Sequence, residues 1–285
     1  MGQASRVPTV HRERAPAKLT RTLRVLGTRA DGFHLLRAEM VSLDLADELV
    51  IDAGGDGLEI RDEIAWIGAQ AAAGPPDADP TPAPSVPPGP TNLVVRALEL
   101  AGRRAHVRLV KRIPPGAGLG GGSSDAAAVL RWAGATDPVA ASRLGADVPF
   151  CIRGGRALVE GIGEVISPLE TETRSFLLCT PGFGVSTALV YRAFDEVGPT
   201  STDGASPNDL ERAALTVEPR LACWRDLVSE TTGRPAVLAG SGSTWFVECD
   251  ADEGPKLAGE LARAVEAARG RALVTLSETI GAMAP

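Results

Sequence analysis

A glycine-rich segment in the middle of the chain most strongly limits how this sequence can fold. Residues 114–130 read PPGAGLGGGSSDAAAVL, so two prolines end the preceding apolar run and five glycines follow within seven positions. Small apolar residues with helical spacing come next, which predicts a helix that begins near Ser123 and Ser124. The sequence therefore predicts a strand, a stretch of bare backbone and a helix in direct succession.

This strand–loop–helix unit is suited to bind an anion, and phosphate is the natural candidate. Glycine lets the backbone approach a ligand closely. The free N–H groups at the start of a helix carry a partial positive charge. A plain glycine turn with a serine cap is the structural alternative, but five glycines are more than such a turn needs. We therefore expect a phosphate-binding loop.

Two well-known phosphate motifs do not describe this loop. The Walker A pattern requires a lysine directly after its last glycine, and none stands there. The dinucleotide-binding pattern G-x-G-x-x-G is matched literally by Gly116, Gly118 and Gly121. Two prolines interrupt its junction between strand and loop, however, and the segment lies in the middle of the chain. A nucleotide-dependent oxidoreductase stays as a minor alternative.

A loop without its own lysine needs a cation from elsewhere, and phosphoryl transfer also needs a base. Lys18, in APAKLTRTLRV at the edge of the first expected strand, is the candidate cation. Asp147, in LGADVPF just before an apolar and strand-like run, is the candidate base. Taken singly, Lys18 is more often a solvated lysine and Asp147 a turn or cap residue. Together with the loop, they suffice for phosphoryl transfer.

Composition narrows the classes of function. A length of 285 residues allows one large domain or two moderate ones. The net charge of -7 gives no electrostatic reason to expect nucleic acid or an anionic membrane as a partner. The four cysteines form no CxxC pair, and no apolar run reaches membrane-spanning length. We expect a cytoplasmic protein whose partner is a small-molecule substrate.

The order of expected elements indicates an α+β fold. A proline-rich stretch at 74–90 is expected to be a disordered or polyproline loop at the surface, and a domain boundary is expected near residue 158. The expected strands are 21–27, 38–52, 105–113, 175–180, two within 235–250, and 271–279; the expected helices are 91–102, one from 123 onward, 186–197, 218–230 and 255–270.

Five short motifs together resemble the GHMP kinase superfamily. They are APAKL, ADGFHLL at 30–36, the glycine-rich loop, LGADVPF and LAGSGST at 238–244, and the likeness runs from about residue 14 to 275. Within the superfamily the chain is most similar to the family of kinases that phosphorylate 4-diphosphocytidyl-2-C-methyl-D-erythritol. The resemblance implies a GHMP kinase fold: an N-terminal domain like the second domain of ribosomal protein S5 (1–158) and a ferredoxin-like C-terminal domain (159–285).

The resemblance also implies a reaction and its machinery. ATP, with Mg²⁺, would phosphorylate the 2-hydroxyl of that substrate in non-mevalonate isoprenoid biosynthesis. Lys18 and Asp147 fall on the catalytic pair, Asn92 on a position near the adenine, and residues 240–243 on a motif that shapes the cleft. The resemblance assigns the ATP loop to Pro114, Pro115, Gly116, Ala117, Gly118, Leu119, Gly120, Gly121, Gly122, Ser123 and Ser124.

The substrate pocket is expected around the ADGFH element. The resemblance places Phe33, His34 and Tyr191 at the cytidine, and a ring held between Phe33 and Tyr191 with His34 at its edge would read cytosine. Thr20 stands where the family usually has asparagine, and we expect it near the substrate and the lysine. A kinase for another small alcohol and a ligand-binding homologue with impaired catalysis stay as alternatives.

Overall fold

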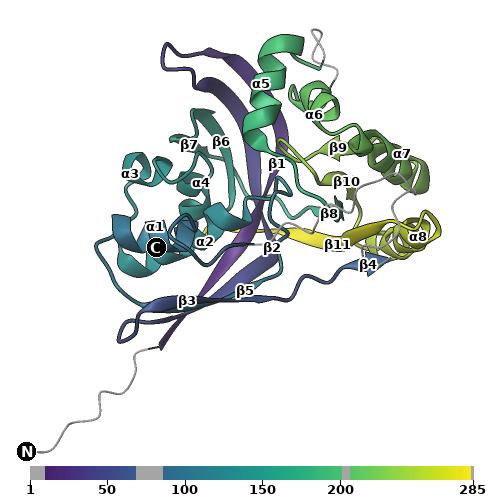
Figure 1. Ribbon diagram of the computed structural model, residues 1–285. Coiled ribbons are helices and arrows are strands. Elements are labelled where there is room, and N and C mark those ends of the chain that lie inside the picture. Colours follow the sequence, from purple (N-terminus) through teal and green to yellow (C-terminus); the bar gives the residue numbers. More distant parts are fainter. Residues whose placement is uncertain (1–9, 69–85, 201–205, 284–285) are drawn as a thin grey trace, which may run out of the picture.

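Two long strands form the backbone of the molecule in this computed structural model, which describes residues 10–68, 86–200 and 206–283. Strands β1 (Val10–Thr28) and β2 (His34–Asp52) pair as an antiparallel hairpin that runs through the molecule (Figure 1). The pairing shifts register three times along β1, and such bulges bend a strand without ending it. Lys18 therefore lies within a long strand. The sequence indicates the edge of a short strand, and that expectation is wrong.

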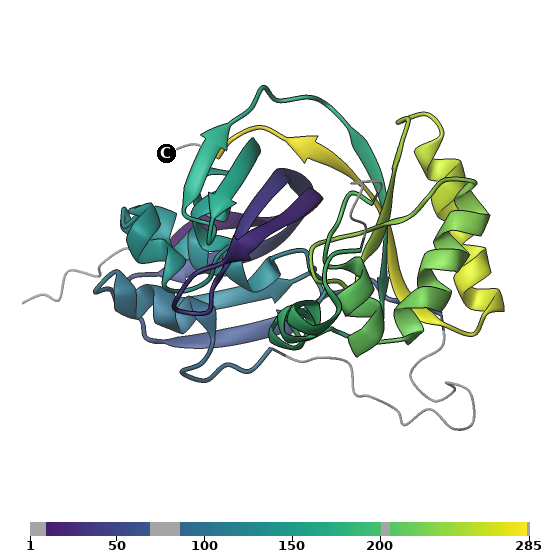
Figure 2. The ribbon, with the colours of Figure 1, turned by 90° about the horizontal axis from the view of Figure 1, so that it is seen from above.

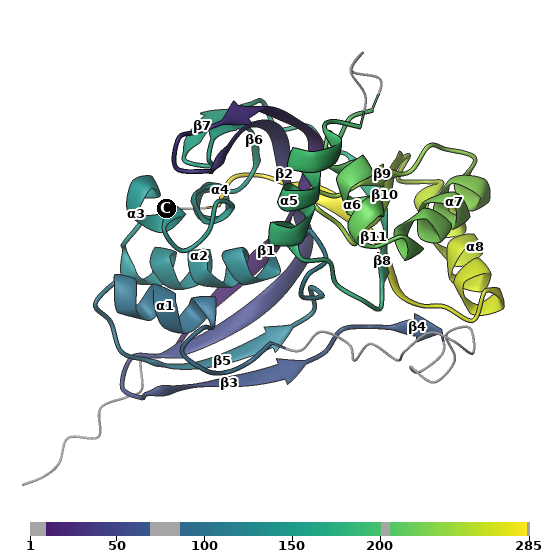
Figure 3. The same ribbon diagram turned by 45° about the horizontal axis from the view of Figure 1, so that its top comes forward.

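The N-terminal half is a sheet built around β2 and covered by helices. Strands β5 (His106–Lys111) and β6 (Arg156–Gly161) both pair with β2. Helices α1 (Leu93–Leu100) and α2 (Gly121–Ala133) lie side by side against this sheet (Figure 3). The remaining elements of this half are β3 (Gly57–Asp62), α3 (Pro138–Ser142), α4 (Val148–Arg153) and β7 (Val165–Pro168). The short strand β4 (Ile67–Gly68) follows β3 in the sequence but pairs with β11 (Arg271–Ile280) of the C-terminal half.

The C-terminal half has the strand order β11-β8-β10-β9, with helices packed on the strands (Figure 2). This order and the βαββαβ sequence of elements are those of a ferredoxin-like domain, as expected. Its elements are β8 (Ser175–Pro181), α5 (Thr187–Val197), α6 (Glu211–Val217), α7 (Arg220–Thr232), β9 (Val237–Leu238), β10 (Trp245–Cys249), α8 (Gly254–Ala267) and β11 (Arg271–Ile280).

A shared apolar core and a strand pairing connect the two halves. Buried residues of β1 and β2 pack with Phe176 of β8 and Phe246 of β10 in one cluster. The end of β11 also pairs with β2. Residue 158 lies inside β6, and the chain passes to the C-terminal half between β7 and β8. The division into two domains near residue 158 stays a prediction.

Six charged side chains form a closed ring on the surface that also spans both halves. Three arginines alternate with three glutamates, and adjacent charges are 2.6 to 3.2 Å apart. The side chains are 19 to 47% exposed. In order around the ring they are Arg21, Glu39, Arg156, Glu172, Arg174 and Glu248, which returns to Arg21. We call this set the charged ring.

The structure differs from the expected type of one element, the run after Asp147, and does not describe most of the proline-rich stretch. The apolar run after Asp147 is the short helix α4, not a strand. Pro149 stands in the first turn of that helix, where its missing N–H is not needed and its fixed φ favours helix. Of the proline-rich stretch at 74–90, residues 74–85 are outside the part of the chain that the structure describes.

Candidate active site

A cavity of about 470 Å³ is lined by both halves of the molecule. The N-terminal half contributes Lys18, Thr20, Asn92, Asp147 and most of the glycine-rich loop. The C-terminal half contributes Thr187, Tyr191, Leu210, Gly240 and Ser241. Residues far apart in the sequence thus meet in one cavity, and most of the predicted site residues are among them.

Lys18 and Asp147 form an ion pair in this cavity. Their Nζ and Oδ2 atoms are 3.2 Å apart. Lys18 is only 5% exposed, whereas the Asp147 side chain is 28% exposed and stands at the start of α4. The lysine ammonium also donates a hydrogen bond to Thr20 Oγ1 at 3.2 Å. Thr20 therefore contacts the lysine although it replaces the family's usual asparagine.

The glycine-rich loop packs directly on the lysine. Lys18 N–H donates to the carbonyl of Leu119 at 3.0 Å. Gly120 has φ of 67°, and a Cβ there would stand 2.6 Å from Lys18 Cγ. A Cβ at Gly118 would be 2.1 Å from the carbonyl oxygen of Ala239 in the C-terminal half. Part of the glycine content therefore serves close packing of the loop rather than ligand contact.

Two predicted loop residues do not line the cavity. Leu119 is 1% exposed and packs in the shared core. Ser124 is fully buried, and its hydroxyl donates to the carbonyl of Pro16 at 2.6 Å, which ties α2 to β1. Gly120, not a serine, occupies the N-cap position of α2. The free N–H groups of this helix start therefore belong to three glycines and Ser123, which all line the cavity.

Asn92 stabilises another wall of the cavity through two hydrogen bonds of its side chain. Its side-chain oxygen accepts from Val94 N–H at 2.9 Å and so caps α1. Its amide group donates to the carbonyl of Pro87 at 2.8 Å. Both Pro87 and Asn92 line the cavity, so this side chain holds one wall in place.

A buried charge cluster under the loop was not predicted. Lys111 Nζ donates to Asp47 and, at 2.7 Å, to Asp125, and all three side chains are nearly inaccessible. Burial raises the pKa of Asp125 to about 7, which Lys111 opposes and Asp47 reinforces. Burial alone would lower the pKa of Lys111, but the two carboxylates outweigh it and raise that pKa. We call these three residues the buried cluster.

One sequence signal could have revealed this cluster. Along the expected strand 105–113, Lys111 falls in register with Val107, Leu109 and Ile113, which are all buried. A lysine on the apolar phase of a strand is expected to need a buried counter-charge.

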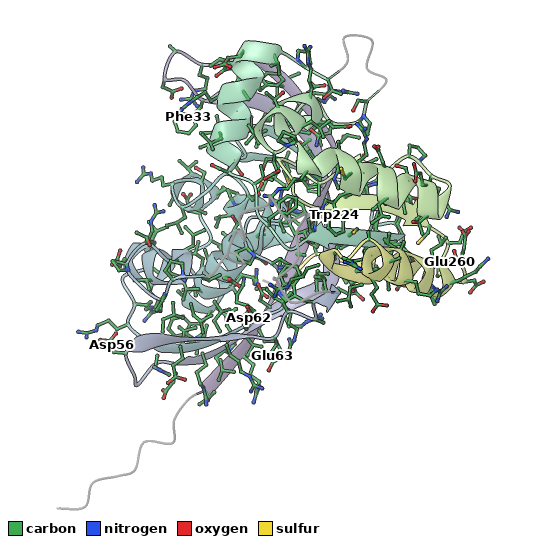
Figure 4. All side chains as sticks on the ribbon, turned by 45° about the vertical axis from the view of Figure 1, so that its right-hand side comes forward. Phe33, Asp56, Asp62, Glu63, Trp224 and Glu260 are labelled. Carbon is green, nitrogen blue, oxygen red and sulfur yellow. The ribbon has the colours of Figure 1, made fainter. Side chains whose placement is uncertain are left out.

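The three aromatic residues expected at the substrate do not form the expected sandwich in this conformation. Phe33 is 58% exposed at the end of the β1–β2 hairpin, beside α5 and away from the centre of the molecule (Figure 4). His34 instead stacks on Tyr191, with ring centroids 4.8 Å apart and planes at 27°. Nε2 of His34 is 2.7 Å from a carboxylate oxygen of Asp195. The roles of these residues at the substrate stay predictions.

Tyr191 is the member of this group that lines the cavity. Burial and, to a smaller extent, the Asp147 carboxylate raise the pKa of its hydroxyl above the ordinary value. The phenol is therefore neutral at physiological pH and can offer a hydrogen bond as well as a ring face.

The described ranges contain neither a cluster of metal ligands nor a membrane-spanning helix. No group of three or more His, Cys, Asp or Glu residues there could hold a metal ion. No helix of the described chain is long and apolar enough to span a membrane.

Known proteins are similar to this chain in sequence. Residues 92–155 match the family described as GHMP kinases N terminal domain. A 4-diphosphocytidyl-2-C-methyl-D-erythritol kinase of Paracoccus denitrificans (strain Pd 1222) is 36% identical over 257 residues, which cover 84% of this chain and 87% of that protein. These values are high enough to show common family membership over nearly the whole chain.

Solved structures agree in fold. A crystal structure of 4-(cytidine 5'-diphospho)-2C-methyl-D-erythritol kinase is 33% identical, covers 95% of this chain and 100% of that chain, and superimposes with a TM-score of 0.67. The Methanococcus jannaschii mevalonate kinase, at 12% identity and a TM-score of 0.58, covers 98% of this chain and 100% of its own and shares the fold. The expected GHMP kinase fold is confirmed, and the chain belongs to the 4-diphosphocytidyl-2-C-methyl-D-erythritol kinase family within the GHMP kinases.

Proposed function

We propose that this protein transfers the γ-phosphoryl group of ATP to the 2-hydroxyl of 4-diphosphocytidyl-2-C-methyl-D-erythritol. The observation that carries the proposal is the Lys18–Asp147 pair beside a glycine-rich helix start, in a cavity lined by both halves. Kinases with that substrate in their name are similar over most of the chain, which supports this choice of alcohol.

Asp147 is positioned to act as the base. Its carboxylate is partly exposed in the cavity, so it can accept the proton of the substrate hydroxyl. The hydroxyl oxygen then forms a bond to the γ-phosphorus, and the bond from that phosphorus to the β–γ bridging oxygen breaks, so ADP leaves. Lys18, held by Asp147 and Thr20, stabilises negative charge on the transferring group.

The glycine-rich loop is proposed to hold the phosphates of ATP. The N–H groups at the start of α2 point to a site for anions, because a helix start has free donors and a partial positive charge. Asn92 and Pro87 form the wall where the family places the adenine. Tyr191 and His34 are proposed to contact the cytidine from the C-terminal side.

Magnesium fits this site in the way that is usual for kinases. Mg²⁺ is commonly held by substrate phosphates and one or two protein oxygens, so a dedicated cluster of carboxylates is not required. Ser123 lines the cavity at the start of α2, and its hydroxyl is the proposed protein ligand. The ion would neutralise charge on the phosphates of ATP. A small-molecule substrate is the only partner this proposal requires, and a cytoplasmic location stays a prediction.

A coupled assay of ADP release tests the proposal. Purified protein with ATP, Mg²⁺ and the diphosphocytidyl substrate should release ADP, whereas homoserine or mevalonate in its place should not. Asp147→Asn should lower kcat by about 10²-fold or more and leave ATP binding nearly unchanged. Release of ADP only with another alcohol would support the alternative kinase, and binding without turnover would support an impaired homologue.

A further inference from the structure

The described residues just before α6, 206–210, contact a turn of the active site through one buried side chain, that of Asn208. Asn208 is 2% exposed and uses its whole amide group in hydrogen bonds. Its nitrogen donates to the carbonyls of Leu238 and Gly240, at 2.8 and 2.7 Å. Its oxygen accepts from Leu210 N–H at 2.9 Å. One side chain thus holds the first part of the turn at 238–242, on both sides of Ala239, and Gly240 of this turn lines the cavity.

The same segment is fixed to the strand that carries the lysine. Leu23, five residues after Lys18 in β1, donates its N–H to Pro207 at 2.8 Å and accepts from Asp209 N–H at 3.0 Å. Asp209 also accepts from Val25 N–H at 3.0 Å. Asn208 therefore sits between two backbone bonds to β1, which makes it a connection of fixed length between that strand and the turn at 238–242.

The turn that Asn208 holds lies directly over the lysine. A Cβ at Gly240 would be 3.4 Å from Lys18 Nζ and 3.8 Å from Thr20 Oγ1. The next residue, Ser241, shares a hydrogen bond of 2.8 Å with the hydroxyl of Thr187 at the start of α5. A small displacement of this turn would change the space in which the phosphoryl group and the acceptor hydroxyl must meet.

We propose that Asn208 is a positioning residue for phosphoryl transfer, because it sets the distance between the Gly240–Ser241 backbone and the Lys18 ammonium. The inference rests on the proposed kinase function. Asn208 is not a catalytic residue, since it acts through the turn. Reactions of this kind depend strongly on the alignment of reacting groups, so a displacement of about 1 Å can lower the rate by up to about 10²-fold.

Kinetics of matched variants test this proposal. Asn208→Ala should lower kcat by about tenfold or more, while the Kd of a non-hydrolysable ATP analogue, measured by calorimetry, should change by less than about threefold because the glycine-rich loop stays in place. The control is Thr232→Val, which removes a buried hydroxyl that donates to Val228 at 2.7 Å within α7. The control should lower Tm and leave kcat unchanged.

Asn208→Asp gives a second readout and replaces the alanine variant if that variant does not fold. Aspartate keeps the size and the bond from Leu210 N–H but turns an acceptor toward two carbonyls. Its kcat relative to the unaltered protein should be low at pH 8 and should rise toward pH 6, since protonation restores one donor. A rise in kcat toward pH 6 while Tm stays above the assay temperature at both pH values distinguishes a positioning role from an effect on stability.

Two results would overturn the proposal. One is a folded Asn208→Ala or Asn208→Asp protein with kcat within twofold of the unaltered protein. The other is a loss of kcat in Thr232→Val equal to that in the Asn208 variants, which would assign the effect to stability. Failure of the unaltered protein to release ADP with the diphosphocytidyl substrate would instead remove the proposed function, so the two failures are distinguishable.

Discussion

The buried cluster and the charged ring differ in how their charges are stabilised: the first is closed off from water, and the second is solvated. In the buried cluster a single cation, Lys111, lies between Asp47 and Asp125, and none of the three side chains is more than 4% exposed. In the charged ring, three cations and three anions alternate at the surface, where water also solvates them. The ring has more ion pairs, but each pair is screened.

This difference shows that the number of ion pairs is a poor guide to their contribution to the free energy of unfolding. An exposed pair contributes about 0 to 1 kcal/mol, whereas removal of one partner from a buried pair costs about 3 to 5 kcal/mol. The ring spans both halves, yet its loss should be mild. The buried cluster lies within one half, directly under the glycine-rich loop, and its loss should be severe.

The largest expected effect is on the buried cluster. Lys111→Met should lower the free energy of unfolding by about 3 to 5 kcal/mol, because two carboxylates would stay buried without a cation. The neighbouring Arg112→Met is the matched control, since Arg112 is 36% exposed and pairs with Glu48 and Glu63 at the surface. It should cost at most about 1 kcal/mol. Urea unfolding of both variants measures the difference, and equal losses would contradict the comparison.

The next effect is a dependence of stability on pH. The pKa of Asp125 is raised from 3.8 to about 7, so between these values the folded state binds a proton that the unfolded state does not. Asp125 therefore contributes stability that is complete below about pH 4 and is lost as the pH rises toward 7, by at most about 1.4 kcal/mol per pH unit. Unfolding of the protein and of Asp125→Asn at pH 5, 6, 7 and 8 isolates this group. A difference between the two that is constant with pH would contradict the assignment.

A substitution in the glycine-rich loop should also disturb the buried cluster beneath it. A Cβ at Gly121 would be 3.0 Å from Ile113 Cγ2 and 3.2 Å from Lys111 Nζ, so Gly121→Val should crowd the buried cluster. We expect a loss of about 1 to 2 kcal/mol in stability together with weaker ATP binding. Gly122→Ala is the control for the loss of stability alone, since its Cβ would meet only Leu93 at an ordinary 3.4 Å. Unfolding and calorimetry measure both effects, and an unchanged Gly121→Val protein would exclude this contact.

The smallest effect should come from the charged ring. Glu39 accepts from both Arg21 and Arg156, and Glu39→Gln should cost no more than about 1 kcal/mol. Unlike the loss at Lys111, this loss should shrink further in 1 M NaCl, because salt screens exposed charges. Unfolding at low and high salt checks it. A decrease of more than about 2 kcal/mol in the free energy of unfolding that does not change with salt would contradict this prediction, because buried networks behave in that way.

The parts of this molecule that follow local rules could be predicted from its sequence. The helix after Asn92, the strands with apolar alternation and the loop of glycines all depend on neighbours in the chain. The ferredoxin-like arrangement and the pairing of Lys18 with Asp147 came from resemblance, since the two residues lie far apart in the sequence. The structure brings them to 3.2 Å.

The partners in distant contacts could not be predicted, although the position of Lys111 among buried strand residues indicates that it needs a buried counter-charge. Asp47 and Lys111 meet only because β2 and β5 pair, and Asn208 reaches its turn only because the segment around it pairs with Leu23. The sequence after Asp147 predicts a strand where the structure has a helix, because the six residues of this helix, with a proline in the first turn, are too few to show helical spacing. The ADGFH motif predicts Phe33 at the substrate, but Phe33 itself is exposed at the end of the β1–β2 hairpin.

Contacts between the glycine-rich loop and the other half have a consequence for how ligands enter. Gly116 and Ala117 accept backbone hydrogen bonds from Val185 and Thr244 of the C-terminal half, at 3.0 and 3.1 Å. The two halves therefore cannot move apart at this loop without breaking both hydrogen bonds. We therefore expect the proposed substrates to enter through the mouth of the cavity while its walls keep their spacing, and the molecule to have the same hydrodynamic radius with and without them.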